Sequence, residues 1–328
     1  MITLDDIRKP IADRLEEFEQ FVRSSFNEKE GTMLAEMIDY ILSSRGKGLR
    51  PTLTMLVAAA TSPSGSFGKR TMLAAMLVEM IHTASLVHDD VIDESLQRRG
   101  QASVNARWQS RNAVIVGDYI LARNMDIGLK SGQFDLLSHI IGSMATLCEG
   151  EILQSQHATD KDTTRQDYFE IIYKKTASLI SISASAGALS VKASRSDIEQ
   201  MRRFGEAIGM AFQIQDDILD YSRSAKTGKP ANNDLREGKI TLPLIEVLEK
   251  CSPAEKVQLI DRLSQCKEDE SAVDFLQGVV EATGGLAMAA RTMQTYIDRA
   301  TSILAKYPDS PYRTALVNLC AFIAERDK

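Results

Sequence analysis

Apolar residues recur with helical spacing along almost the whole chain, and the alternation that marks a half-buried strand is nearly absent. Short polar connections interrupt the pattern, as expected between packed antiparallel helices. The pattern therefore predicts an all-α protein, and because no break divides it, one domain over residues 1–328. The longest predicted helices cover residues 73–91, 113–129, 136–157, 168–189 and 198–221, with breaks at 62–68, 130–133 and 158–165.

Two segments depart from ordinary amphipathic helix. Residues 177–188 are mostly Ala, Ser and Gly. Such small side chains either let helices approach closely or leave space for an elongated cavity, and close packing accounts for most of them. Residues 222–239 contain Gly, Pro and Asn and form the longest irregular stretch. Because this stretch directly follows a group of acidic residues, we predict a mobile lid there.

The sequence Asp-Asp-x-x-Asp occurs twice, each time near the end of a predicted apolar helix. Residues i and i+4 share a helix face, so the outer two carboxylates of each copy repel unless a cation lies between them. Mg²⁺ takes oxygen ligands and is often shared with substrate phosphates. Solvated helix faces would explain these carboxylates less well, because the flanking residues are apolar. The two copies are Asp89, Asp90 and Asp93, and Asp216, Asp217 and Asp220.

Basic residues flank both acidic motifs, as a substrate phosphate would require. Lys47 and Arg50 lie three residues apart at a predicted helix start, where backbone N–H groups also favour anions. Arg98 and Arg99 follow the first motif within a few residues. A single basic residue of this kind is usually a surface charge, but the grouping around the motifs favours a site. The other candidates are Lys174, Lys175, Lys229 and Lys239.

The bulk composition narrows the class of protein. A hydrophobic content of 44% supports a substantial core, and the formal net charge of −6 argues against a nucleic-acid partner. No uninterrupted apolar run reaches the length of a membrane span, and the N-terminus lacks the features of a signal peptide. The four cysteines have no metal-ligand spacing and are expected to be reduced. We expect a cytoplasmic protein.

Five separated motifs resemble those of the trans-isoprenyl diphosphate synthases, and within that family the long-chain, octaprenyl-type polyprenyl diphosphate synthases. They read GKGLRP, HTASLVHDDVIDESLQRRG, KKTASL, FQIQDDILDY and GKPANNDLREGKITLPL, in the family's order from Gly46 to Leu244. The resemblance implies antiparallel helices around a deep central cavity, usually in a homodimer. It also implies Mg²⁺-dependent head-to-tail condensation of isopentenyl diphosphate with an allylic diphosphate, farnesyl or geranylgeranyl diphosphate.

The resemblance also implies roles for residues that match the family's motifs. Asp89, Asp93 and Asp216 would be direct ligands of three Mg²⁺ ions, with Asp90, Asp217 and Asp220 in support. Arg98, Lys175 and Lys229 would grip the allylic diphosphate, and Lys239 would help from the lid. Gly46, Lys47, Arg50, His82 and Arg99 would hold isopentenyl diphosphate. Thr176 and Gln213 would lie beside the developing allylic cation.

The implied chemistry agrees with these residue types. Loss of diphosphate concentrates negative charge on the leaving group, which Mg²⁺ and basic side chains stabilise. The double bond of isopentenyl diphosphate attacks the allylic cation, and a proton is then lost. No His or Glu occupies an obvious general-base position, so the departing diphosphate is the expected proton acceptor. Water must be excluded from the cation, which gives the predicted lid a purpose.

The growing chain is expected to run along the helix of the first acidic motif, away from the metals. Ala84 and Ser85 lie one turn before Asp89, where short-chain members of the family tend to place bulky residues. Their small size leaves the floor open for roughly another 12 Å, at about 1.5 Å per residue, and favours a product of about six to ten isoprene units. The next floor candidates are Ile81, Val78 and Leu77, with Val114, Ile115 or Tyr119 from the facing helix.

Several alternatives share some of these features. A short-chain farnesyl or geranylgeranyl diphosphate synthase would use the same chemistry. A class I terpene cyclase usually carries a different second metal motif and would not need the Lys47 and Arg50 pair. A regulatory subunit typically loses its acidic motifs, although the catalytic subunit of a heteromeric synthase would keep them. A metal-buffering bundle would leave the basic residues unexplained. The apolar product also predicts transient membrane contact during release.

Overall fold

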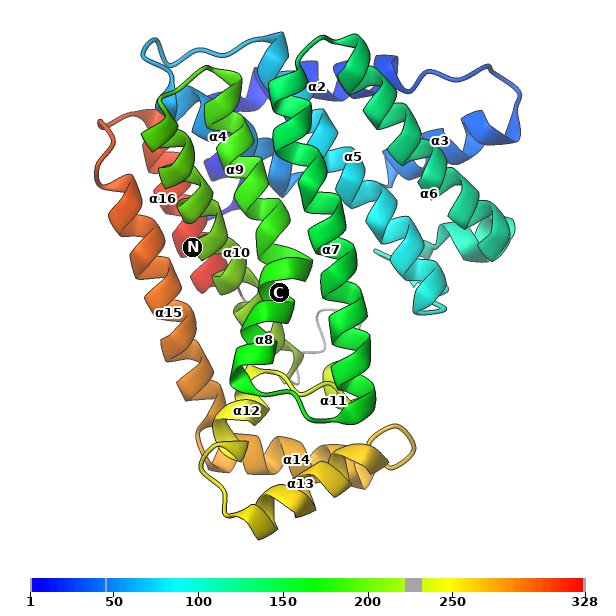
Figure 1. The fold of residues 1–328 in the computed structure, drawn as a ribbon, viewed down its shortest axis with the longest axis vertical. Coiled ribbons are helices and arrows are strands. Elements are labelled where there is room, and N and C mark those ends of the chain that lie inside the picture. Colours follow the sequence, from blue (N-terminus) through cyan, green and yellow to red (C-terminus); the bar gives the residue numbers. More distant parts are fainter. Residues whose placement is uncertain (1, 45, 222–231, 327–328) are drawn as a thin grey trace.

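The structure, a computed structural model, describes residues 2–44, 46–221 and 232–326. Nearly all regular structure in these residues is helical. The exception is a small antiparallel hairpin of β1 (Gln97–Arg98) and β2 (Gln101–Ala102). The predicted all-α class is confirmed. The long helices run roughly along one axis, and the helices between residues 242 and 282 lie at the lower end of the molecule (Figure 1).

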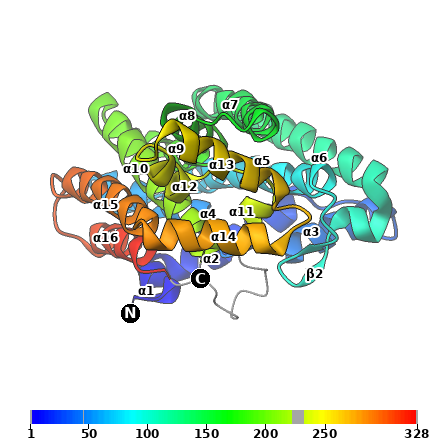
Figure 2. The same cartoon turned by 90° about the horizontal axis from the view of Figure 1, so that it is seen from below.

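Four helices form the centre of the molecule, and the others surround them (Figures 1 and 2). The central helices are α4 (Leu49–Thr61), α5 (Lys69–Ile92), α9 (Ser178–Ser190) and α10 (Arg195–Asp220). Around them lie α6 (Val104–Lys130), α7 (Phe134–Asp160), α8 (Arg165–Ile172), α15 (Gly285–Leu304) and α16 (Pro311–Ala324). The remaining elements are α1 (Leu4–Arg8), the 3₁₀ turn η1 (Lys9–Ile11), α2 (Ala12–Ser25), α3 (Met33–Ser43), α11 (Asn233–Arg236), α12 (Leu242–Leu248), α13 (Pro253–Gln265) and α14 (Glu270–Ala282).

The helix predicted over residues 168–189 is not continuous. Between α8 and α9 the chain forms one π-helical turn, η2 (Tyr173–Ala177). A π turn inserts an extra residue into the helical repeat, and such turns are frequent at functional sites. Gly150 of α7 lies against this turn, and a Cβ there would come within 2.7 Å of the Lys175 backbone nitrogen. The π turn therefore lies where α7 packs tightly against the main chain of Lys175.

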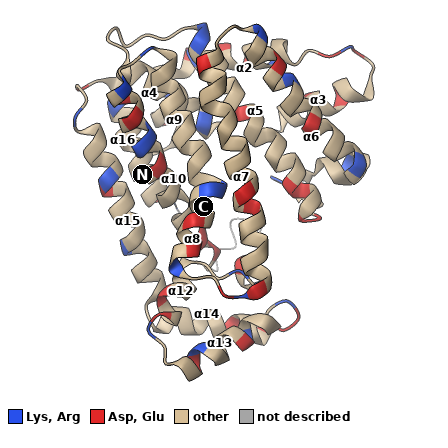
Figure 3. Ribbon diagram, viewed as in Figure 1, with Lys and Arg blue, Asp and Glu red and all other residues tan. Residues whose placement is uncertain are grey.

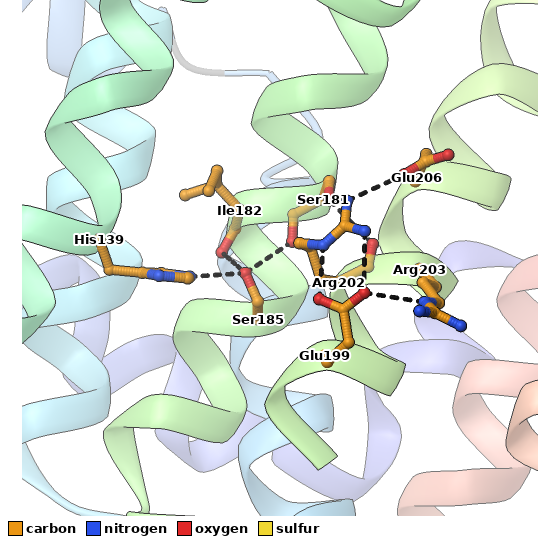
Figure 4. A network of polar contacts seen from close by, with 8 residues as sticks. All are labelled: His139, Ser181, Ile182, Ser185, Glu199, Arg202, Arg203 and Glu206. Carbon is orange, nitrogen blue, oxygen red and sulfur yellow. Dashed lines mark hydrogen bonds and ion pairs between the residues drawn. The ribbon is translucent and has the colours of Figure 1, made fainter. Parts of the chain in front are cut away.

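Close packing explains the small residues of α9. A Cβ on Gly205 of α10 would come within 2.7 Å of the Ile180 carbonyl oxygen, and one on Gly209 within 2.6 Å of the Ala177 Cα. Farther along, Ser185 Oγ and His139 Nε2 of α7 form a hydrogen bond of 2.8 Å. Ser181 donates to the Arg202 carbonyl of α10 at 2.8 Å. Figure 4 shows how these contacts join α7, α9 and α10.

Two helices, α5 and α7, are long and apolar enough to cross a membrane by length and composition, although neither is an uninterrupted apolar run. The apolar window of α5 is 72% buried within the protein, as in any core helix, whereas that of α7 is 28% buried. α7 therefore buries Leu136, Ile140 and Leu147 in the core and exposes other apolar residues, among them Phe134, Ile141 and Ile152. All four cysteines are unpaired, in agreement with their scattered spacing.

Candidate active site

A cavity of about 810 Å³ opens between α4, α5, α7, α10 and the π turn. Residues from both acidic motifs line it together with several of the predicted basic residues. α9, which passes beside it, carries no charged residue (Figure 3). The lining includes Gly46, Lys47, Arg50, His82, Ser85, Asp89, Arg99, Lys175, Thr176, Gln213 and Asp216. Eleven residues predicted from the sequence, up to 170 positions apart, thus line the same cavity.

The first acidic motif lies at the C-terminal end of α5. Burial raises the pKa of Asp89 to about 6, and the charges of Glu151 and Asp93 add to the rise. Asp93 follows the last helical residue, and its N–H donates to the Asp89 carbonyl at 2.8 Å. Asp90 is buried and accepts hydrogen bonds from Arg98 at 2.7 Å. Asp90 therefore fixes Arg98, while Asp89 faces the cavity in an environment that favours a cation.

The hairpin after α5 presents two successive arginines to different partners. Arg99 and Gly100 have φ values of 55° and 76°, the left-handed conformation of a two-residue hairpin turn. Arg98 turns toward Asp90, and Arg99 donates to the Ser44 carbonyl at 3.3 Å. The Arg99 guanidinium also covers Gly46, where any Cβ would overlap it. A side chain at position 46 would therefore displace the Arg99 guanidinium from this position.

His82, seven residues before Asp89 on α5, lines the same cavity and lies near the charges of Arg50, Arg98 and Arg99. Burial lowers the pKa of His82 well below its ordinary value, and the charges of Arg50 and Arg99 lower it further. The imidazole is therefore neutral at pH 7. Buried Glu79 lies one turn earlier on α5 and lines the same wall. Lys47 is exposed at the rim.

The π turn places Lys175 and Thr176 in the cavity. Lys175 Nζ donates to Glu151 Oε2 at 2.7 Å and to Gln154 Oε1 at 2.8 Å, both on α7. Lys174 points elsewhere and pairs with Glu149 and Glu170 near the surface. Of the two adjacent lysines, only Lys175 is directed at the cavity.

The three aspartates of the second motif have different environments. Asp216 lines the cavity and forms an ion pair with Arg326. Asp217 is buried and accepts hydrogen bonds from Tyr168 Oη at 2.6 Å and Gln213 Nε2 at 2.9 Å. Burial, followed by the charge of Asp234, raises the pKa of Asp217 well above its ordinary range. Thr176 completes this chain of contacts by donating to Gln213 Oε1 at 2.8 Å.

Asp220 connects the second motif to the following segment. Its carboxylate accepts the N–H groups of Asn233 at 3.1 Å and Asp234 at 3.0 Å, and so caps α11. Lys239 lies just beyond α11 and forms an ion pair with Glu237. Part of the predicted lid is therefore a short helix. Residues 222–231, which include Lys229, lie outside the described residues.

Comparisons with known proteins agree with this geometry. A model of the polyprenyl synthetase family matches residues 31–280. The chain belongs to the polyprenyl synthetase family. It is 36% identical over 322 residues to an all-trans-nonaprenyl-diphosphate synthase (geranyl-diphosphate specific) of Rhodobacter capsulatus, covering 98% of this chain and 97% of that protein. It is 33% identical to the octaprenyl diphosphate synthase of Escherichia coli over 88% of each chain.

A solved structure of a decaprenyl diphosphate synthase from Rhodobacter capsulatus is also similar, with a TM-score of 0.91 and 31% identity. The match covers 99% of this chain and 100% of that one. The resemblance predicted from the motifs is thus confirmed, and so is the arrangement of helices that it implied.

Within this polyprenyl synthetase fold, the predicted floor residues do not lie together. Ser85 lines the cavity, whereas Ala84 and Ile81 are buried in the core beside it. Val114 and Ile115 are 40% and 55% exposed, so neither side chain packs into the core, and their contact with the growing chain stays a prediction. The inward face of α6 is formed by Ala113, Val116, Gly117, Ile120 and Asn124. Tyr119 forms a hydrogen bond with Glu28 instead.

Several residues of the site were missed by the sequence interpretation. Glu151 and Gln154 could have been suspected, because they are polar residues within a predicted apolar helix. Glu151 lines the cavity, and Gln154 accepts a hydrogen bond from Lys175. Phe212 also lines the cavity, but an aromatic residue in an amphipathic helix carries no specific signal. Tyr168, Asp234 and Arg326 reach the site only through tertiary contacts.

Proposed function

We propose that this polyprenyl synthetase condenses isopentenyl diphosphate head-to-tail with an allylic diphosphate, farnesyl or geranylgeranyl diphosphate, in a Mg²⁺-dependent reaction. The product would be a long-chain all-trans polyprenyl diphosphate of about six to ten isoprene units. This length assumes that the growing chain runs along α5, which rises by about 1.5 Å per residue. The observation that carries the proposal is one cavity lined by Asp89 and Asp216 together with Lys47, Arg50 and Lys175.

The carboxylates fit a set of Mg²⁺ ions shared with the substrate. Asp90, Asp217 and Asp220 do not line this cavity and accept hydrogen bonds from neighbouring groups, whereas Asp89 and Asp216 line it; Asp89, Asp216 and the adjacent Asp93 are therefore the proposed ligands of the three expected ions. Among the described residues, no three His, Cys, Asp or Glu side chains lie close enough to hold an ion by themselves. Diphosphate oxygens would complete the coordination, and the bound ions would neutralise charge on the leaving group.

The chain's own residues would orient both substrates. Lys175 and Arg98, with Lys229 and Lys239, would hold the allylic diphosphate, and the basic group around neutral His82 would hold isopentenyl diphosphate. Thr176 and Gln213 would direct oxygen dipoles at the allylic cation, because Asp217 and Tyr168 fix the Gln213 amide. The allylic C–O bond would break first, the double bond of isopentenyl diphosphate would then form the new C–C bond with the allylic cation, and the released diphosphate would take the proton lost from the isopentenyl unit.

The direct test is product analysis with purified protein, Mg²⁺, labelled isopentenyl diphosphate and farnesyl diphosphate. A long prenyl diphosphate, lost in EDTA and in Asp89→Asn, is the expected result. A product of three or four isoprene units would confirm the condensation reaction but refute the proposed length of the channel. No product from folded protein would indicate a second subunit, as in a heteromeric synthase, or refute the enzymatic assignment.

We also propose a cytoplasmic homodimer formed through the outer side of α6 and α7. These helices run along one side of the molecule (Figure 2) and expose large apolar residues. Dimerisation would cover this apolar surface, whereas isolated monomers would expose it to water. Light scattering of the purified protein should give a dimer mass. The exposed residues are Val114, Ile115, Leu129, Phe134, Ile141 and Ile152.

Release of so apolar a product would require transient contact with a membrane surface. Detergent or lipid vesicles should therefore raise steady-state turnover and leave the rate of the first condensation unchanged.

A further inference from the structure

The last described residue of the chain lies inside the proposed active site. Arg326 follows the end of α16 and lines the same cavity as Asp89 and Lys175. Its guanidinium forms an ion pair with Asp216 and lies 4.4 Å from the centre of the Phe212 ring. Gln215 Nε2 donates to the Arg326 carbonyl at 2.8 Å. Three positions of α10 therefore hold both the main chain and the side chain of Arg326.

This contact differs from an ordinary surface salt bridge. The Arg326 side chain is only 14% exposed, and its Nε is buried without a hydrogen-bond partner. Burying a guanidinium with an unsatisfied N–H is costly, so the neighbouring groups must supply a compensating attraction. The Asp216 carboxylate and the Phe212 ring offset this cost, because both attract a cation.

Asp216 is also one of the three carboxylates left available for Mg²⁺. A divalent ion bound to Asp216 would lie within a few ångströms of the Arg326 guanidinium. Like charges at that distance repel strongly at a partly buried site, so the ion and the guanidinium compete for one carboxylate.

We propose that Arg326 is the counter-cation of Asp216 in the metal-free enzyme, and that Mg²⁺ displaces it. Arg326 is thus a positioning residue for the second acidic motif. It keeps the Asp216 carboxylate directed into the cavity until the metal arrives. This inference rests on the metal role of Asp216 proposed above. By reciprocity, metal binding at Asp216 weakens the docking of the chain end on α10.

Mn²⁺ binding to the full-length protein in the presence of inorganic diphosphate, followed by electron paramagnetic resonance, tests the exchange, because the side chains alone do not complete a metal site. Arg326→Gln removes the competing cation and should tighten Mn²⁺ binding about fivefold, at the lower end of typical coupling between two sites. Arg326→Lys keeps the charge and should stay near wild type. Arg313→Gln is the matched control, because it removes a guanidinium of α16 that pairs with exposed Asp309 outside the cavity.

Thermal unfolding supplies a second readout. In EDTA, Arg326→Gln should unfold at a lower temperature than wild type, and saturating Mn²⁺ should close that difference. The deficit of Arg313→Gln should be the same with and without the metal, as for any structural ion pair. Unchanged or weaker Mn²⁺ binding by Arg326→Gln would overturn the exchange.

Asp216→Asn separates the two proposals. If wild type and Asp216→Asn bind Mn²⁺ equally, Asp216 is not a metal ligand, and both the proposed metal site and the exchange are wrong. If Asp216→Asn weakens binding but Arg326→Gln leaves it unchanged, the metal site stands and only the role of Arg326 is refuted.

Discussion

Removing the hydroxyl of Tyr168 should reduce activity without touching any group that contacts substrate. Tyr168 donates to Asp217 at 2.6 Å, and Asp217 in turn fixes Gln213 beside Thr176. In Tyr168→Phe, Asp217 keeps one donor and the Gln213 amide gains freedom to rotate. We expect kcat to fall about tenfold, which corresponds to ~1.4 kcal/mol of lost transition-state stabilisation, while KM for isopentenyl diphosphate stays the same.

The cost in stability follows from the protonation state of Asp217. Because its pKa is raised well above its ordinary range, chiefly by burial, the metal-free enzyme retains a proton there at neutral pH. The lost hydrogen bond is then worth about 1 kcal/mol, and about 2–3 kcal/mol once the carboxylate ionises. The folded pKa lies above the unfolded one and rises further in the variant. The destabilisation by Tyr168→Phe therefore grows as pH rises above neutrality.

Urea unfolding in EDTA at neutral and alkaline pH, with steady-state kinetics at neutral pH, would measure both effects. Tyr307→Phe is a matched control, because Tyr307 donates to Asp197 at 3.0 Å at the far end of α10. The control should lose a similar amount of stability at neutral pH and keep its kcat. Wild-type kcat in Tyr168→Phe, or a destabilisation that does not change with pH, would refute the proposed role of the Asp217 network.

Four further substitutions probe other parts of the structure. Ser85→Phe should shorten the product in a labelled chain-length assay, because Ser85 lines the cavity. Ala84→Phe should also shorten the product, but it should cost ~1–3 kcal/mol of stability because Ala84 is fully buried. If neither variant changes the chain length of the product, the proposed direction of the channel is refuted. Gly46→Ala should displace Arg99 and raise KM for isopentenyl diphosphate about tenfold, and an unchanged KM would exclude Arg99 from that site. Burial lowers the pKa of His139, so the unfolded chain binds a proton that the folded one does not, and stability should fall as pH drops below about 6.5. In urea titrations at two pH values, the free energy of unfolding of His139→Gln should fall less at the lower pH than that of wild type.

Much of the site follows from the sequence because its determinants are local. The i and i+4 spacing places Asp89 near Asp93, and the glycine-flanked basic segment places Arg50 at the start of α4. The positions of the long helices follow in the same way from their apolar periodicity. The π turn does not, because one extra residue in the repeat leaves the surrounding pattern almost unchanged.

The different roles of the aspartates could not be predicted from local spacing. Asp217 is fixed by Tyr168, which is 49 residues away, and Asp216 by Arg326, which is 110 residues away. The outward position of Val114 also escaped prediction, because apolar residues are commonly assumed to point inward. A large part of any protein surface is apolar, and only the packing of α6 on α5 decides which face is buried.

The hydrogen bonds around Asp220 connect the second acidic motif to a helix remote from the cavity. The Asn232 N–H donates to the Asp220 carbonyl at 2.7 Å, and buried Gln277 of α14 bonds to both Tyr221 and Asn232. A change in the packing of α14 is therefore transmitted directly to the C-terminal end of α10. The short helices at the lower end of the molecule thus share in positioning the second acidic motif, although they contribute no residue to the cavity lining.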